Sequence, residues 1–263
     1  MLRLPERLLG WRGRSPRPIQ EELGKDGPLT AMVIMAHPDD AEFLCAGTVA
    51  KWCHQGWTVY YLLATSGDKG THDPDLSVQQ LAAIREQEQR EACKVLGVRE
   101  CIFLGYPDGF LENTLELRGQ IVRLLRRYKP DVVITWDGFR RGFNHRDHRN
   151  IGIATWDALY PAVRDHLYYP EHAGDGPEAH SVNHLLLAGS DEPDYHVDIG
   201  AYLDKKLDAL FCHRSQLGGR TREELMQRWR ERARQARRAA WSPHTESFRW
   251  IRMGAPMRGA ARR

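Results

Sequence analysis

The stretch from Ala31 to Gly56, AMVIMAHPDDAEFLCAGTVAKWCHQG, decides the fold. It begins with an apolar run over residues 31–36, which has the length of a short buried strand and stops at His-Pro-Asp-Asp. Residues 41–55 then have the pattern of a helix, and Gly56 stands at the left-handed position that commonly ends one. A strand that leads through a polar turn into a helix is the building unit of α/β sheets.

The same order of elements recurs along the chain. Further strands are predicted at residues 58–65, 101–104 and 131–136, and helices at residues 78–96, 115–128 and 147–160. Two more strand candidates, residues 183–188 and 195–199, precede a helix at residues 201–214. Strands that alternate with helices form a largely parallel sheet with helices on both faces. No repeat or linker interrupts this pattern, so we predict a single α/β domain.

The two ends of the chain differ from the middle in composition. Residues 1–28 are rich in proline, glycine and charge and are expected to form an N-terminal arm on a domain that spans residues 29–217. Residues 218–263 are rich in arginine and are expected to form a helical extension packed on the same domain. Glutamates are interleaved with these arginines, a pattern typical of a solvated helix face, so we predict no nucleic-acid partner.

Composition limits the class of protein. The chain has 263 residues, a net charge of +3 and no apolar run of about 18 residues, so no integral membrane segment is expected. The basic N-terminus lacks the apolar core and cleavage site of a signal peptide. The five cysteines form no CxxC pair, which favours buried thiols in a reducing compartment. We therefore expect a cytoplasmic protein, and a homo-oligomer stays open.

Unusual polar residues follow two of the predicted strands. They are His37, Asp39 and Asp40 after the first strand, and His145, Asp147 and His148 after the strand at residues 131–136. Taken singly, an aspartate could cap the following helix and the histidines could lie in an exposed loop. Taken together, they would meet at the carboxyl edge of the sheet, where ligands bind in open α/β folds.

Three of these side chains have the character of metal ligands. A catalytic zinc needs three nitrogen or oxygen ligands and one open position, and His37, Asp40 and His148 supply that set. Asp39 cannot easily reach the same ion, because adjacent side chains diverge at a turn, so it would lie beside the open position as a general base. His145, one helical turn from His148, could donate to a carbonyl oxygen that gains charge.

Five short segments, in a fixed order, carry a family resemblance. They are AHPDDAE (36–42), TSGDKG (65–70), AAIREQEQREACKVLG (82–97), NHRDH (144–148) and KKLDALFCHRSQ (205–216). In these segments the chain resembles the PIG-L/LmbE-type zinc deacetylases, which include N-acetylglucosaminyl deacetylases of glycolipid anchors, of sugar-thiol compounds and of chitobiose. The paired HPDD and HxDH motifs are specific, whereas the other segments are weak alone.

The resemblance implies a Rossmann-like fold and one zinc ion per chain. The implied zinc ligands are His37, Asp40 and His148. The implied catalytic residues are Asp39 as general base, His145 as oxyanion stabiliser or acid, and Asp147 as the residue that orients His145.

The resemblance also implies substrate-binding residues outside the two central motifs. They are Arg85, Asp68, Asp108 and His213. For His213 a second interpretation stays open, namely a cation at a helix end that contacts carbonyl groups.

Two positions depart from the family pattern and concern substrate choice more than chemistry. Arg146 stands where proline is usual, and Phe143 stands where several members have tyrosine. We predict a metal-dependent N-deacetylase that hydrolyses the acetyl amide of an N-acetylglucosamine-type sugar conjugate. The alternatives are hydrolysis of a different N-acyl or thiol-conjugate amide, and a non-catalytic sugar- or nucleotide-binding module. No GxGxxG follows the first strand, which argues against a dinucleotide.

Overall fold

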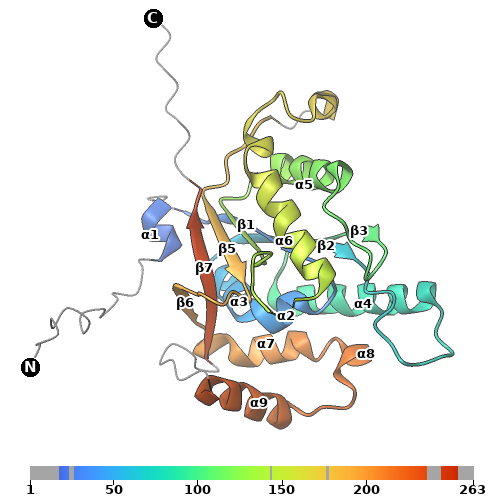
Figure 1. The fold of residues 1–263 in the computed structure, drawn as a ribbon. Coiled ribbons are helices and arrows are strands. Elements are labelled where there is room, and N and C mark those ends of the chain that lie inside the picture. The colour runs from blue at the N-terminus through green and yellow to red at the C-terminus, as the bar shows by residue number, and fades with distance from the viewer. Residues whose placement is uncertain (1–17, 24–26, 143, 176–177, 236–243, 254–263) are drawn as a thin grey trace, which may run out of the picture.

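The chain folds around a seven-stranded sheet in the order β3-β2-β1-β4-β5-β7-β6 (Figure 1). The computed structural model describes residues 18–23, 27–142, 144–175, 178–235 and 244–253. The parallel strands are β1 (Thr30–Met35), β2 (Thr58–Thr65), β3 (Glu100–Tyr106), β4 (Val132–Trp136) and β5 (His184–Ala188). Two strands pair antiparallel at one edge, β6 (Tyr195–Asp198) and β7 (Thr245–Arg252). The predicted largely parallel α/β sheet is confirmed.

Helices cover both faces of the sheet (Figure 1). One face packs against α2 (Asp40–Leu44), α3 (Ala46–His54), α4 (Val78–Leu96) and α7 (Leu203–Leu210). The other packs against α5 (Leu115–Tyr128) and α6 (Arg146–Leu159). The remaining helices are α1 (Ile19–Leu23), α8 (Arg214–Leu217) and α9 (Arg222–Gln235), with short 3-10 turns at Ala162–Arg164, Pro170–Asp175 and Gly200–Tyr202. No described helix is long and apolar enough to cross a membrane.

Local sequence signals set both ends of α4. Ser77 and Gln80 form a capping box at the start of α4, with each side chain accepting a hydrogen bond from the backbone N–H of the other. Gly97 ends α4 in the left-handed conformation, with a φ of 88°. The helix predicted at residues 78–96 is therefore confirmed to the residue.

The helix predicted at residues 41–55 is broken at Cys45 into α2 and α3. The cause lies far away in the chain, on β7. Both carboxylate oxygens of Glu246 accept hydrogen bonds at the start of α3, from the N–H of Gly47 at 2.9 Å and of Thr48 at 2.6 Å. Because Glu246 caps these groups, α3 begins as a new helix.

The chain ends differ from the expected arm and helical extension. Residues 222–235 form the expected helix α9, but residues 245–252 form β7 inside the sheet, because Phe248 and Trp250 alternate into the core. At the other end, Ile19 of α1 is also buried in the core. Residues 1–17, 24–26, 236–243 and 254–263 lie outside the described residues.

The site-bearing strands lie where the strand order reverses. β2 and β3 extend from β1 in one direction, and β4 and β5 extend in the other. Ligands of open α/β sheets bind at such a switch point, beyond the carboxyl ends of the strands. The HPDD segment follows β1 and the NHRDH segment follows β4, so both predicted motifs lie at this point.

His184, at the start of β5, should make the stability of the sheet depend on pH. Its Nδ1 accepts a hydrogen bond from Trp250 Nε1 at 3.0 Å, and burial lowers the pKa of the ring below its ordinary value of 6.5. Below pH 6.5 the His184 ring therefore binds a proton more readily in the unfolded chain than in the folded one. The free energy of unfolding should fall as the pH drops below 6.5, by at most about 1.4 kcal/mol per pH unit.

Urea unfolding at about pH 7.5 and about pH 5.5 measures this change. The variant His184→Asn keeps an acceptor for Trp250 but does not titrate, so its loss of stability should be smaller than that of the wild type. Equal losses in the two proteins would show that His184 is not the source.

Candidate active site

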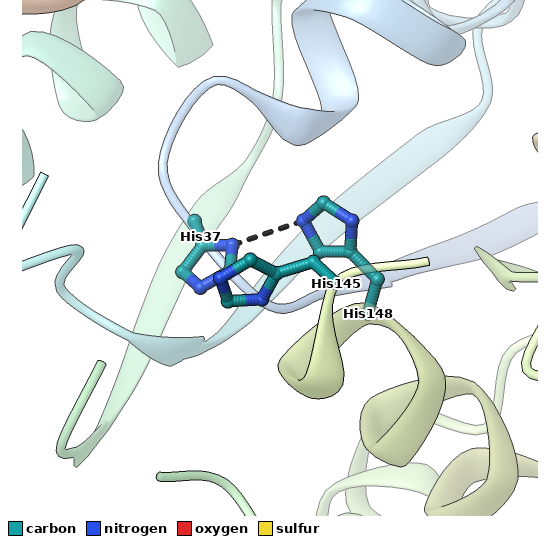
Figure 2. Close-up of side chains that lie close together, drawn as sticks. All are labelled: His37, His145 and His148. Atoms are coloured by element: carbon teal, nitrogen blue, oxygen red, sulfur yellow. Dashed lines mark hydrogen bonds between the residues drawn. The ribbon is translucent and has the colours of Figure 1, made fainter. Parts of the chain in front are cut away.

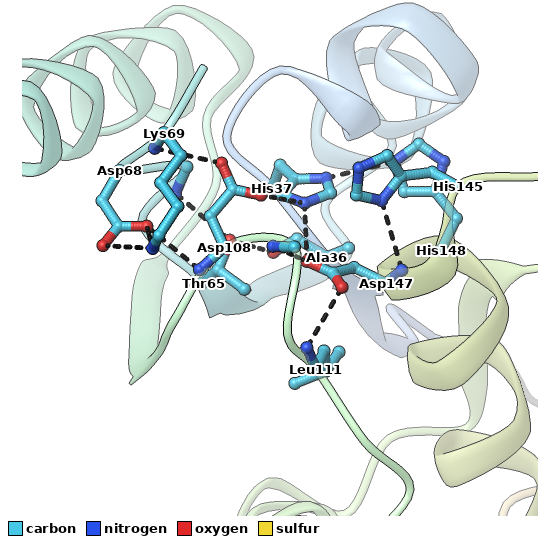
Figure 3. Close-up of polar contacts among 12 residues, drawn as sticks. Ala36, His37, Thr65, Asp68, Lys69, Asp108, Leu111, His145, Asp147 and His148 are labelled. Atoms are coloured by element: carbon cyan, nitrogen blue, oxygen red, sulfur yellow. Dashed lines mark hydrogen bonds and ion pairs between the residues drawn. The ribbon is translucent and has the colours of Figure 1, made fainter. Parts of the chain in front are cut away.

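Polar side chains from several loops meet beyond the carboxyl ends of the strands (Figure 3). The loop after β1 brings His37 and its neighbours, the loop after β3 brings Asp108, and the start of α6 brings Asp147 and His148. Two groups among the described residues have the spacing of metal ligands, namely His37 with His145 and His148, and His37 with Asp108 and Asp147. The cluster is therefore a possible metal-binding site.

The side chains of His37, Asp40 and His148 form a small triangle on the Nδ1 side of His37. Nδ1 lies 3.1 Å from His148 Nε2, which lies 3.1 Å from Asp40 Oδ1, and Asp40 Oδ2 lies 3.7 Å from His37 Nδ1. Figure 2 shows the rings of His37, His145 and His148 grouped together. Ligands about 2.0–2.2 Å from a tetrahedral zinc are separated by about 3.3–3.6 Å. The two contacts of His148, at 3.1 Å, are slightly shorter than this separation, and Asp40 offers a different oxygen to each histidine.

The surroundings of Asp40 leave one of its two oxygens for a metal. Oδ2 accepts hydrogen bonds from the N–H of Ala36 at 3.1 Å, the N–H of His37 at 2.9 Å and Trp136 Nε1 at 2.9 Å. Oδ1 faces His148. Burial alone would raise the pKa of Asp40, but His148 and His37 outweigh it and hold the pKa well below its usual range.

The opposite edge of the His37 ring is held by carboxylates. Its Nε2 lies 3.0 Å from Asp108 Oδ1 and 3.1 Å from Asp147 Oδ2. Burial lowers the pKa of His37, but Asp108, Asp147 and Asp40 outweigh it and raise that pKa to about 11. A metal-binding histidine commonly donates its other ring N–H to a carboxylate. The two edges of the ring therefore match a metal side at Nδ1 and a supporting side at Nε2.

Asp147, which the resemblance implied as the residue that orients His145, has described contacts with that ring through its backbone and with other groups through its carboxylate. Besides His37, that carboxylate accepts hydrogen bonds from the N–H of Gly109 at 2.7 Å and of Leu111 at 3.1 Å. The backbone N–H of Asp147 instead donates to His145 Nδ1 at 3.2 Å. An acceptor at Nδ1 leaves the proton of the neutral ring on Nε2. Burial, together with the charges of His37 and His148, lowers the pKa of His145 and favours that neutral ring.

Asp39 lies at the same turn but is held by different partners. Its φ of 91° is unusual for a residue with a side chain. The N–H of Asp39 donates to Gln89 Oε1 at 3.1 Å, and one carboxylate oxygen lies 3.3 Å from Arg85 Nη2. Burial raises the pKa of Asp39 to about 6, although the Arg85 guanidinium acts in the opposite direction.

Arg85 supports the loops around the site from behind. It is buried, and its guanidinium donates to the carbonyl oxygens of Gly67 at 2.9 Å and Pro38 at 2.6 Å. A Cβ at Gly67 or Gly70 would collide with this guanidinium, which explains both glycines of the TSGDKG segment. Arg85 therefore links the TSGDKG loop to the HPDD turn and reaches the Asp39 carboxylate.

Asp68 and Asp108 tie two loops together. Asp68 Oδ1 accepts the N–H of Asp108 at 3.0 Å, and Asp108 Oδ2 accepts the N–H of Lys69 at 3.2 Å. Burial alone would raise the pKa of Asp108, but the hydrogen bond and charge of His37 outweigh it and lower that pKa to about 2. Of the two aspartates, Asp108 contacts His37 directly, whereas Asp68 holds the backbone of Asp108 in place.

His213 is completely buried, and its Nε2 lies 3.1 Å from Glu42 Oε2. It contacts the site only through other side chains.

Two arginines near the site form ion pairs within the chain: Arg146 pairs with Glu112 at 2.6 Å and Arg140 with Asp191 at 3.4 Å. Phe143 lies outside the described residues.

Sequence reasoning missed Trp136, the last residue of β4. Besides its hydrogen bond to Asp40, its ring stacks on His148, with centroids 3.9 Å apart and planes 10° apart. Its place at the carboxyl end of a predicted strand, just before the NHRDH loop, was the sequence feature that could have indicated a role at the site. Glu42 and Gln89 were also missed as functional residues, although both lie inside quoted motifs.

Comparison with known proteins gives the same relatives in sequence and in structure. Residues 32–159 match the family described as "PIG-L: GlcNAc-PI de-N-acetylase". The chain is 32% identical over 185 residues to the diacetylchitobiose deacetylase of Thermococcus kodakarensis, which covers 70% of this chain and 69% of that protein. It is 30% identical over 200 residues to a probable N-acetyl-alpha-D-glucosaminyl L-malate deacetylase 2 of Bacillus anthracis, which covers 73% of this chain and 83% of that protein.

The fold agrees with these relatives. The structure of N,N'-diacetylchitobiose deacetylase from Pyrococcus horikoshii superposes with a TM-score of 0.75 and 27% identity, over 89% of this chain and 90% of that one. The predicted family resemblance and fold class are confirmed.

Trp136→Phe tests the support of Asp40. The variant keeps a ring over His148 but removes the donor to Asp40 Oδ2, so metal affinity should fall by about 10–100-fold with little change in melting temperature. Titration with zinc against a competing chelator measures the affinity. Trp250→Phe is the matched control, because it removes a tryptophan N–H donor remote from the cluster. Equal affinities in the Trp136 variant and the wild type would contradict the role.

Proposed function

The chain belongs to the PIG-L family of GlcNAc-PI de-N-acetylases, and on this premise we propose that it uses zinc to remove the acetyl group from an N-acetylglucosamine-type conjugate. It is an N-deacetylase, a hydrolase of carbon–nitrogen bonds other than peptide bonds. The non-catalytic binding module is set aside. The observation that carries the proposal is the triangle of the His37, Asp40 and His148 side chains, in which His148 Nε2 lies 3.1 Å from both His37 Nδ1 and Asp40 Oδ1.

We assign one zinc ion to this triangle. Two imidazole nitrogens and one carboxylate oxygen suit zinc, and three protein ligands leave one position open, as catalytic sites require. The alternative position, between His37 Nε2, Asp108 and Asp147, is disfavoured because two backbone N–H groups already bind Asp147. When bound, zinc would supply the Lewis acid that polarises the acetyl carbonyl and activates water.

Asp39 is the proposed general base. It precedes Asp40 in the chain, with Arg85 on one carboxylate oxygen and 16% of its side chain exposed. This carboxylate takes the proton of the attacking water as the carbon–oxygen bond forms. The proton then passes to the departing nitrogen, and the products are acetate and a free amino sugar.

His145 is the proposed stabiliser of the oxyanion. Its Nδ1 is occupied by the N–H of Asp147, so its Nε2–H is the group that can donate. The ring lies edge-on to His37, with centroids 4.9 Å apart, beside the triangle. A fixed donor aimed at an oxygen that gains charge stabilises the transition state more than the ground state.

The cysteines support the proposed compartment. All five are free, and Cys45 and Cys93 are buried. Free thiols are typical of a reducing compartment, so we propose that the enzyme acts in the cytoplasm.

Release of free amine from a panel of N-acetylglucosamine conjugates tests the activity directly. The panel contains a disaccharide, an inositol conjugate, a malate conjugate and an S-conjugate of a sugar thiol with its amide intact. We expect zinc-dependent release of acetate from at least one N-acetyl sugar. Release from the thiol-conjugate amide alone would support the alternative amide hydrolase, and no release from any member would contradict the proposal.

Paired substitutions separate the roles of the two adjacent aspartates. In Asp40→Asn, the three donors around Oδ2 require an oxygen there, so the amide nitrogen must take the ligand position and zinc should be lost. Asp39→Asn should keep zinc but lose about 10²–10⁴-fold in kcat, and added zinc should not restore it.

Zinc content by elemental analysis and kcat at saturating zinc measure both effects. Equal loss of zinc in the two variants, or near-normal turnover of Asp39→Asn, would show that the roles are wrongly divided.

A further inference from the structure

Three completely buried polar side chains lie behind Asp39. They are His213, Glu42 and Gln89, each 0% exposed. His213 immediately precedes α8, Glu42 belongs to α2 and Gln89 to α4, so three separate parts of the chain contribute. None of the three has a described contact with the donor triangle.

The three side chains form one continuous line of hydrogen bonds. His213 Nε2 lies 3.1 Å from Glu42 Oε2, and Gln89 Nε2 donates to Glu42 Oε1 at 3.1 Å. Gln89 Oε1 accepts the N–H of Asp39 at 3.1 Å. A carboxylate only accepts and a peptide N–H only donates, so the amide of Gln89 has a single workable orientation.

The end of this line is the strained residue of the site. Asp39 holds a φ of 91°, a conformation that persists in a residue with a side chain only when its surroundings impose it. The hydrogen bond that its peptide N–H donates to Gln89 Oε1 fixes that N–H, and Arg85 fixes the carbonyl oxygen of Pro38 before it. The direction of the Asp39 carboxylate follows from the peptide geometry at this turn.

Glu42 is a completely buried carboxylate, and its described charged partner is His213. A buried carboxylate is costly unless it is paired and hydrogen-bonded. Burial lowers the pKa of His213, but Glu42 outweighs burial and raises it, which favours a charged pair. Among the described residues, His213 Nδ1 has no hydrogen-bond partner. The ring is therefore held by one described hydrogen bond, between its Nε2 and Glu42.

We propose that His213 is a positioning residue for Asp39, acting through Glu42 and Gln89, and not a substrate ligand. The proposal rests on the proposed role of Asp39 as general base. With His213 removed, Glu42 is left buried and unpaired, it no longer fixes the amide of Gln89, and the peptide of Asp39 loses its restraint. Turnover falls, whereas the zinc ligands and the substrate-contacting surface stay in place.

A second buried ion pair in the same helical layer provides a matched control. Lys206 Nζ lies 2.7 Å from Glu246 Oε1 and donates to the carbonyl oxygen of Phe43 at 3.0 Å. It supports α2 and α3 but has no described link to Gln89 or Asp39. Lys206→Met should therefore lower the melting temperature and leave kcat unchanged.

The test compares His213→Leu with His213→Gln, whose amide nitrogen can still donate to Glu42. His213→Leu should lower kcat by about 10–100-fold with KM and zinc content near the wild-type values, and His213→Gln should recover most of kcat. Gln89→Met removes both central hydrogen bonds at similar side-chain size and should repeat the kcat loss. If His213→Leu does not fold, Gln89→Met alone tests whether the line of hydrogen bonds positions Asp39.

Hydrogen exchange of the Asp39 amide gives a readout that needs no substrate. Exchange should be faster in His213→Leu and Gln89→Met than in the wild type, His213→Gln and Lys206→Met. The inference is overturned if exchange is unchanged, if kcat falls only in proportion to lost zinc, or if KM alone rises. Absence of activity in the wild type would overturn the proposed function instead, while amide exchange would still decide the positioning role.

Discussion

The ring of His37 faces two different environments, and the rest of the site depends on keeping them apart. On its Nδ1 side lie His148 Nε2, at 3.1 Å, and Asp40 Oδ2, at 3.7 Å. On its Nε2 side, Asp108 and Asp147 accept the ring proton. An imidazole that rotated out of this plane would lose both sets of contacts together. The ends of β1 and β3 and the start of α6 are therefore positioned by one side chain.

Backbone N–H groups supply much of the support for the carboxylates. Asp40 folds back onto the N–H groups of Ala36 and His37, so the HPDD segment closes its own turn. Asp147 is held in the same way by Gly109 and Leu111 of the loop after β3. These donors cannot rotate away as side chains can, so each carboxylate is fixed before a ligand arrives. Such preorganisation is what an active site needs to hold its groups in productive geometry.

Patterns of short range were sufficient to predict the strands β1 to β6, the helices α4 to α6 and the convergence of HPDD and NHRDH at one sheet edge. The contacts that were not predicted join residues that are remote in sequence. Trp136 lies 96 positions from Asp40, Asp147 lies 110 from His37, and Glu246 lies 198 from the helix start that it caps. Periodicity cannot reveal such pairs, because each depends on how separate elements pack. The alternation of Phe248 and Trp250 was a local signal for β7, but the surrounding arginines obscured it.

The position of the bound metal tests the central claim most directly. A crystal of zinc-loaded protein, measured at the zinc absorption edge, locates the ion by its anomalous scattering. We expect one peak about 2.0–2.2 Å from His37 Nδ1, Asp40 Oδ1 and His148 Nε2. A peak on the other edge of the His37 ring, between Asp108 and Asp147, would contradict it, as would the absence of any peak in the cluster.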